Sequence, residues 1–247
     1  MNEYEIKALK EVQAWQKQMM MKPSYFNKLS KRWQDKINGI IPEKVHQAIT
    51  AAIKQMFRVV LFGSELTTSD ARAEGNLEMR EAIVQEKITF YKHTGAAEGG
   101  ITGAGGILLG LADFPLFMGI KMKLLFEIAS TYGYKTSDYR ERLFILYIFQ
   151  LTFSSQQKRM EIFQKINDWA AYSKTLPEDI NQFDWRVFQQ EYRDYIDLAK
   201  MAQLVPVIGA PVGAVVNYQL IKKLGKMAMN AYRLRWQPTE VLSTSAH

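Results

Sequence analysis

The sequence predicts an all-α fold, a single multi-helix bundle with a central glycine-rich helix pair at about residues 95–120 and 206–232. Three observations lead to this prediction. Apolar residues recur at helical spacing along most of the 247 residues. Proline and glycine mostly stand at the ends of these segments, and hairpin dipeptides between alternating strands are absent. Two uncharged segments rich in small residues then stand out from an otherwise polar chain.

Four helices are expected in the N-terminal third. The first covers residues 3–21 and the second residues 25–38. Pro42 suits the first turn of a third helix, because its φ is already helical and its missing N–H needs no partner there. That helix carries an apolar stripe at spacings of three and four, formed by Val45, Ile49, Ile53, Met56 and Val60. Residues 68–70, Thr-Ser-Asp, offer N-cap side chains for a fourth helix that runs to about Tyr91.

The C-terminal half is also expected to be helical. Residues 136–152 begin with Thr-Ser-Asp and continue into an unbroken aromatic and aliphatic run. Such a run could be a buried strand, but no turn signals or partner strands surround it, so a buried helix is predicted. Residues 155–175 and 183–203 are interpreted as polar-faced helices, and residues 218–236 as an amphipathic helix.

Glycines follow a regular pattern in and around the first uncharged segment, residues 99–112. Residues 95–119 hold 8 of the 15 glycines. Five of them follow spacings of four, four, three and four: Gly95, Gly99, Gly103, Gly106 and Gly110. On a helix this spacing makes one groove without side chains, and Asp113 continues it. Glycine costs a helix about 1 kcal/mol relative to alanine, so we expect a compensating close approach of a second helix.

The second uncharged segment, residues 201–221, supplies the partner groove. Gly209, Gly213 and Asn217 lie four apart on one face, and Asn217 could donate to a buried Asp113 to form a polar core. Residues 99–120 and residues 201–221 are each long enough to span a bilayer, which needs roughly 20 apolar residues. Their glycines, prolines and aspartate favour a buried core pair over stable insertion. Reversible, membrane-triggered insertion is an intermediate alternative.

Positive charge is concentrated at the two ends of the chain, whose net charge is +7. Residues 1–62 hold 11 Lys/Arg against 5 Asp/Glu. Residues 222–236 hold five bases and no acid: Lys222, Lys223, Lys226, Arg233 and Arg235. Basic faces with interleaved aromatic residues suit an anionic membrane surface, and we expect these five side chains to contact it. A solvated face whose aromatic residues point into the core is the alternative.

Other partners and chemistries are less consistent with the sequence. No helix-turn-helix or RNA-binding signature is present, so nucleic acid is not expected as a partner. The chain has no cysteine and three histidines, and we expect no metal site and no cofactor. The glycine-rich run lacks the Gly-Lys-Ser/Thr ending of a phosphate loop. The first twenty residues lack the apolar region of a signal peptide, which predicts a cytoplasmic, membrane-associated protein.

Three residues near the glycine segment are weak catalytic candidates. His93, Glu98 and Asp113 could form an acid/base cluster, and a hydrolase using Glu98 and Asp113 is one alternative function. No nucleophile motif accompanies them, so structural roles are favoured, and a binding protein is favoured over an enzyme. A lipid- or peptide-binding module along the glycine groove is a further alternative.

Two spaced motifs in the chain resemble the EcsC family. The glycine-rich core runs from residue 94 to Asp113-Phe114-Pro115, and the C-terminal signature covers residues 206–218. Residues 41–45 and 63–65 also fit, so the resemblance extends from about residue 5 to residue 236. We therefore expect one EcsC-like helical domain over residues 1–236 and a disordered tail at residues 237–247.

The resemblance also has functional implications. It implies a bacterial accessory protein associated with an ABC exporter, the Ecs transporter, which is linked to protein secretion. It implies no mechanism and supplies no catalytic residue. The sequence has no nucleotide-binding motif, so this protein is not expected to be the exporter's ATPase subunit.

Overall fold

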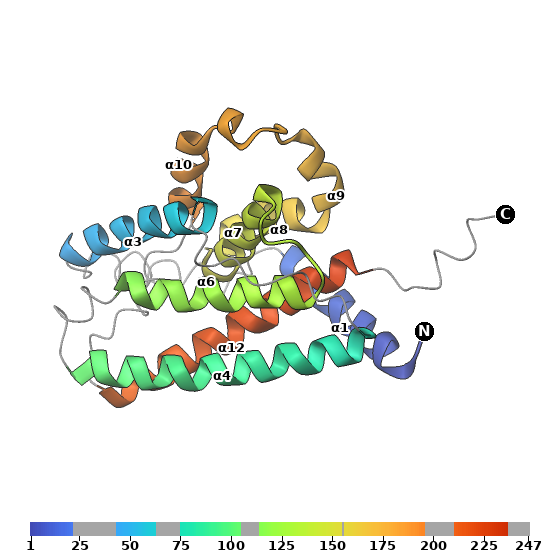
Figure 1. Ribbon diagram of the computed structural model, residues 1–247, viewed down its shortest axis with the longest axis horizontal. Helices are drawn as coiled ribbons and strands as arrows, with labels where there is room; N and C mark the ends of the chain where they lie inside the picture. The colour runs from blue at the N-terminus through green and yellow to red at the C-terminus, as the bar shows by residue number, and fades with distance from the viewer. Residues whose placement is uncertain (22–42, 63–74, 105–113, 155, 196–209, 237–247) are drawn as a thin grey trace.

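The computed structural model describes residues 1–21, 43–62, 75–104, 114–154, 156–195 and 210–236 (Figure 1). The α-helices of this part of the chain are α1 (Glu3–Met20), α3 (Glu43–Phe62), α4 (Leu77–Ala104), α6 (Phe114–Thr131), α7 (Tyr139–Phe153), α8 (Gln156–Asn167), α9 (Trp169–Tyr172), α10 (Trp185–Tyr195) and α12 (Ala210–Arg235). Two short 3₁₀ turns, Ser173–Thr175 and Ile180–Gln182, lie between α9 and α10. The all-α prediction is confirmed. The helix expected at residues 25–38 and the tail at 237–247 lie outside the described residues.

The two long helices α4 and α12 form the most extensive helix pair in the described structure (Figure 1). They are antiparallel, because rising residue numbers on α4 meet falling numbers on α12. At one end Glu81 pairs with Arg233, and at the other Asn217 donates a hydrogen bond to the carbonyl of Gly95. Between these ends the side chain of Ile88 packs against Gly225. The register is therefore fixed by polar contacts at both ends and by close packing between them.

The prediction of one helix over residues 95–120 is wrong. Residues 95–104 end α4, whereas α6 begins at Phe114 and lies beside α4 in the opposite direction (Figure 1). Glu127 of α6 accepts hydrogen bonds from Lys87 and Tyr91 of α4, at 2.9 and 2.8 Å. Pro115 offers the physical reason for a new helix here, because proline cannot donate to a preceding turn and suits a first turn.

The helix α7 occupies the centre of the bundle. It contacts α3, α6, α8 and α12, and every residue from Glu141 to Phe153 is buried. Asp138 caps its N-terminus by accepting a hydrogen bond from the Arg140 N–H at 2.9 Å. Burial on all sides explains its unbroken apolar sequence, so the prediction of a buried helix is confirmed.

A buried arginine on α7 completes the end of a neighbouring helix. Nη1 of Arg142 donates to the carbonyls of Val60 and Leu61, at 3.2 and 2.8 Å, in the last turn of α3. Carbonyls in the last turn of a helix generally lack a partner within that helix, and a positive charge suits the negative end of the helix dipole. Arg142 therefore anchors α3 to the central helix.

Glycine permits close contact between α4 and α12 at two described positions. A Cβ at Gly225 would lie 2.6 Å from two atoms of Ile88, and a Cβ at Gly95 would collide with Ile221. Gly99 and Gly103 lie on α4 and Gly213 on α12, but their packing is not among the described features. Gly106, Gly110, Gly209 and Asp113 lie outside the described residues. The groove at these other positions stays a prediction.

Substitution of Gly225 tests this close contact. Gly225→Leu should lower the free energy of unfolding by about 1–3 kcal/mol or more, because it overpacks the contact with Ile88. Gly225→Ala should lower it less, since alanine favours the helix by about 1 kcal/mol. Gly119→Ala is the matched control, because nothing lies within 4 Å of a Cβ at Gly119. Denaturant unfolding measures all three variants, and equal stabilities of the two alanine variants would contradict the close contact.

Candidate functional site

A buried ion pair links α12 to α4. Nη2 and Nε of Arg233 lie 2.5 and 2.6 Å from the two carboxylate oxygens of Glu81, and Nη1 lies 2.7 Å from Glu11 of α1. Glu81 also accepts hydrogen bonds from the hydroxyls of Tyr4 and Tyr132, at 2.6 and 2.8 Å. Burial acts to lower the pKa of Arg233, but hydrogen bonding to Glu81 and its charge outweigh burial and raise it. The cluster therefore keeps the Arg233 guanidinium charged inside the protein.

A second inward-facing arginine lies two residues further along α12. Nη1 of Arg235 lies 2.8 Å from Glu141, which also accepts a hydrogen bond from the Tyr232 hydroxyl at 2.7 Å. The guanidinium lies over the rings of Tyr134 and Phe144, at 3.8 and 4.3 Å from their centroids. Burial raises the pKa of Glu141, and the neighbouring guanidinium opposes that rise.

These contacts correct the expectation that Arg233 and Arg235 meet a membrane. Arg233 is 8% exposed, and both guanidinium groups are neutralised by carboxylates of other helices. Their side chains hold the bundle together instead. Lys222, Lys223 and Lys226 are exposed on α12, so for these three the expectation stays open.

Removing Arg233 should destabilise the protein strongly. Arg233→Gln leaves Glu81, which is 0% exposed, charged without its counterion, and the expected cost is about 3–5 kcal/mol of unfolding free energy. Glu161→Gln is the control, since it breaks an exposed pair with Lys158 that is worth about 0–1 kcal/mol. Denaturant unfolding compares the two variants. A loss below 1 kcal/mol in Arg233→Gln would show that the buried pair is dispensable.

Buried tyrosines predict a loss of stability at alkaline pH. Burial raises the pKa values of Tyr132, Tyr192 and Tyr232 well above the ordinary value for tyrosine. Burial also raises the pKa of Tyr4, to about 12. Unfolded tyrosines ionise near pH 10. The stability that these groups contribute is therefore complete below about pH 10 and is lost as the pH rises toward their folded-state values.

Stability measured against pH checks this prediction. The free energy of unfolding should fall steadily above about pH 10, and the phenolate absorbance of the buried tyrosines should appear together with unfolding. Tyr192→Phe should reduce the slope of stability against pH, because the buried Tyr192 hydroxyl no longer titrates. Phenolate formation at the ordinary tyrosine pKa in a still-folded chain would contradict the prediction.

A buried lysine lies where α4, α6 and α12 meet. Lys121 is 1% exposed, and its Nζ donates to Oδ1 of Asn217 at 3.1 Å. Asn217 in turn donates to the carbonyl of Gly95. Asn217 is thus a polar core residue with these two described partners, while the partnership predicted with Asp113 lies outside the described residues. Sequence reasoning missed Lys121, because a lone lysine in a helix normally indicates a solvated face.

The described residues do not test the predicted acid/base cluster. His93 is exposed on α4, with its ring 6.1 Å from that of Tyr218. The side chain of Glu98 and all of Asp113 lie outside the described residues. The cluster of His93, Glu98 and Asp113 therefore stays a prediction.

A cation-lined pocket lies between α1, α7, α8 and α12, with a volume of about 490 Å³. Its cations are Arg159 of α8 and Lys222, Lys223 and Lys226 of α12, and its described lining includes no acidic residue. Its apolar lining consists of Trp15, Met19, Leu151 and Met227. Neutral polar side chains complete the wall: Gln18, Thr152, Gln219 and Asn230. We call this feature the basic pocket.

Local contacts position the walls of the basic pocket. Nζ of Lys223 donates to the carbonyl of Thr152 at 3.1 Å, which ties α12 to the end of α7. The Trp15 ring packs edge-on against Phe163, with centroids 5.2 Å apart. Burial lowers the pKa of Arg159. Sequence reasoning singled out the three lysines as binding residues. It did not single out Arg159, because only the packing of α8 brings this residue near α12.

Membrane-spanning segments were considered for residues 99–120 and 201–221. In the part of the chain that the structure describes, no helix combines the length and the hydrophobicity needed to cross a bilayer. Residues 105–113 of the first predicted segment and residues 201–209 of the second lie outside the described residues, so insertion of either segment is not tested.

The fold and the basic pocket define a helical-bundle protein with a cation-lined pocket. The comparisons with known proteins then give its family: residues 6–236 match the EcsC protein family, and the chain belongs to that family. It is 42% identical to Protein EcsC of Bacillus subtilis (strain 168), over 92% of this chain and 94% of that protein. It is 25% identical to the uncharacterized protein YdbA of the same organism, over 92% of this chain and 90% of YdbA. No solved structure matches significantly.

Proposed function

We propose that this protein is a membrane-associated accessory protein that acts by binding and works with an ABC exporter. Its membership of the EcsC family supports the exporter part of the proposal, through the association that the family resemblance implies. Binding is the favoured mode of action because the described residues present a basic pocket.

The exposed lysine face of α12 is the observation that carries the proposal. Lys222 and Lys226 are exposed, and neither forms an ion pair with any described residue. The opposite side of α12 is buried against α4, so the helix can present these charges while it remains in the bundle. Such a face supports peripheral attachment, because each basic residue near an anionic surface contributes about 1 kcal/mol.

A lysine double variant tests membrane attachment. Lys222→Gln combined with Lys226→Gln should cost about 2 kcal/mol of binding free energy, or roughly a thirtyfold loss of affinity. The measurement is cosedimentation of the full chain with vesicles of phosphatidylglycerol and phosphatidylcholine, at low and high salt. Binding by the native chain should weaken at high salt, because exposed charges are screened.

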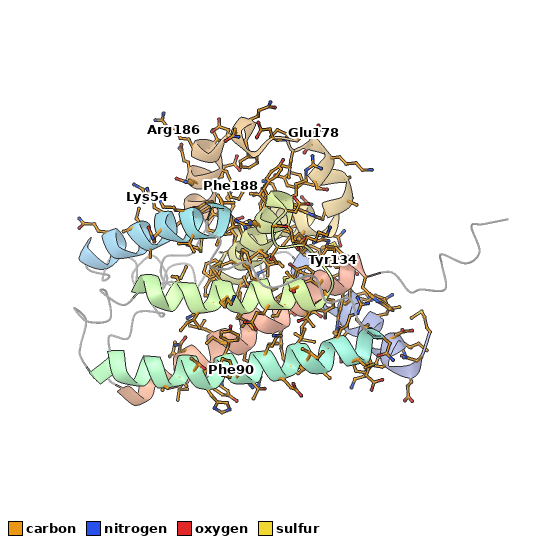
Figure 2. All side chains as sticks on the ribbon, in the orientation of Figure 1. Lys54, Phe90, Tyr134, Glu178, Arg186 and Phe188 are labelled. Atoms are coloured by element: carbon orange, nitrogen blue, oxygen red, sulfur yellow. The ribbon has the colours of Figure 1, made fainter. Side chains whose placement is uncertain are left out.

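A matched double variant controls for net charge. Lys54→Gln with Arg186→Gln removes two exposed charges from α3 and α10, at the top of the view in Figure 2 and away from α12. This variant should retain nearly native vesicle binding. Equal losses in the two double variants would show that only net charge matters, and failure of the native chain to bind would refute membrane attachment. Co-isolation of the exporter with the tagged full chain tests the second part of the proposal.

A further inference from the structure

The lysines of α12 form one wall of a concave site rather than an isolated charged face. Gln219, Lys222, Lys223, Lys226, Met227 and Asn230 follow one face of the helix and line the basic pocket. Arg159 of α8 adds a cation from a second helix, and α1 contributes Trp15 and Met19. A charged face that attracts a membrane requires none of this concavity, so the arrangement calls for a more specific ligand.

We propose that the basic pocket binds a single anionic phospholipid, with its phosphate among Arg159 and the lysines and its apolar part against Trp15 and Met19. This proposal rests on the proposed function, because it names the ligand class of the same lysine face. It goes further by assigning a bound lipid molecule, a stoichiometry and a role for Arg159.

The charge of the pocket selects an anion. Four cationic side chains line it, and no described carboxylate does. Arg159 is half-buried and forms no ion pair with any described residue, while burial lowers the pKa of its guanidinium. A desolvated guanidinium without a counterion is unfavourable, and its planar N–H groups match two oxygens of a phosphate. A bound phosphate would therefore supply the counterion that the described residues do not provide to Arg159.

The apolar lining selects a lipid over a free phosphate. Trp15, Met19, Leu151 and Met227 line the same pocket as the four cations. An inorganic phosphate gains nothing from apolar surface, whereas acyl chains do. The volume of about 490 Å³ also lies within the range of small-molecule sites, roughly 300–1,000 Å³. Charge and apolar area together fit an amphiphile.

Titration with a soluble lipid tests the proposal without a membrane. The full chain is titrated calorimetrically with dihexanoyl phosphatidylglycerol, below the concentration at which this lipid forms micelles. We expect saturable binding of one molecule per chain. Dihexanoyl phosphatidylcholine, which lacks net charge, and glycerol phosphate, which lacks acyl chains, should each bind at least tenfold more weakly.

Two arginine variants locate the site. Arg159→Gln should weaken binding of the short-chain lipid about tenfold or more, because it removes a charged hydrogen-bond donor. Arg186→Gln on α10 makes the same chemical change at an exposed position away from the pocket and should bind like the native chain. Circular dichroism and thermal melts establish that both variants fold. Unchanged lipid affinity in a folded Arg159→Gln variant would overturn the assignment.

The remaining outcomes separate this proposal from the proposed function. Equal affinity for glycerol phosphate and the lipid would identify a phosphate site and overturn the lipid assignment. Vesicle binding without binding of the soluble lipid would overturn the pocket site but leave membrane attachment standing. Soluble-lipid binding that depends on Arg159, without vesicle attachment, would support the pocket and refute the membrane part of the proposed function.

Discussion

The ion pair between Arg233 and Glu81 is the contact on which the rest of the bundle depends. Both groups are buried, and the cost of removing two charges from water is offset only when every polar atom finds a partner. Those partners come from three directions: Glu81 from α4, Tyr132 just after α6, and Tyr4 and Glu11 from α1. One arginine near the end of α12 therefore positions three other parts of the chain. It also helps to set the register that places Gly225 against Ile88 and Gly95 against Ile221.

The basic residues of α12 fall into two groups. Its arginines point into the bundle, where a planar guanidinium can bind a carboxylate through two parallel hydrogen bonds and stack on aromatic rings. Its lysines point outward, where a flexible, strongly hydrated ammonium is less costly to expose. The division explains how a run of five bases can both hold the fold together and leave a cationic face available for binding.

Helix α1 contacts both the buried Arg233–Glu81 ion pair and the basic pocket. Glu11 holds one part of α1 against Arg233, at 2.7 Å, and Gln16 donates to Asn167 at the end of α8, at 2.8 Å. Trp15 lies between these two contacts and faces the pocket. The polar contacts that order α1 thus also fix the apolar wall that a lipid would meet, so the geometry of the pocket is a consequence of the folded core.

The sequence alone determined the helical class and the position of the buried helix α7, because helical spacing, N-caps and an unbroken apolar run are local signals. It also predicted that Asn217 is a core residue and that the lysines of α12 lie on a different face from its apolar stripe. Tertiary structure decided the rest. Arg233 and Lys222 look alike in the sequence, and only the approach of Glu81, from far along the chain, buries one and leaves the other exposed. Arg159 and Lys121 likewise acquire their roles from neighbouring helices, and no local pattern records which side chains a distant helix will bring.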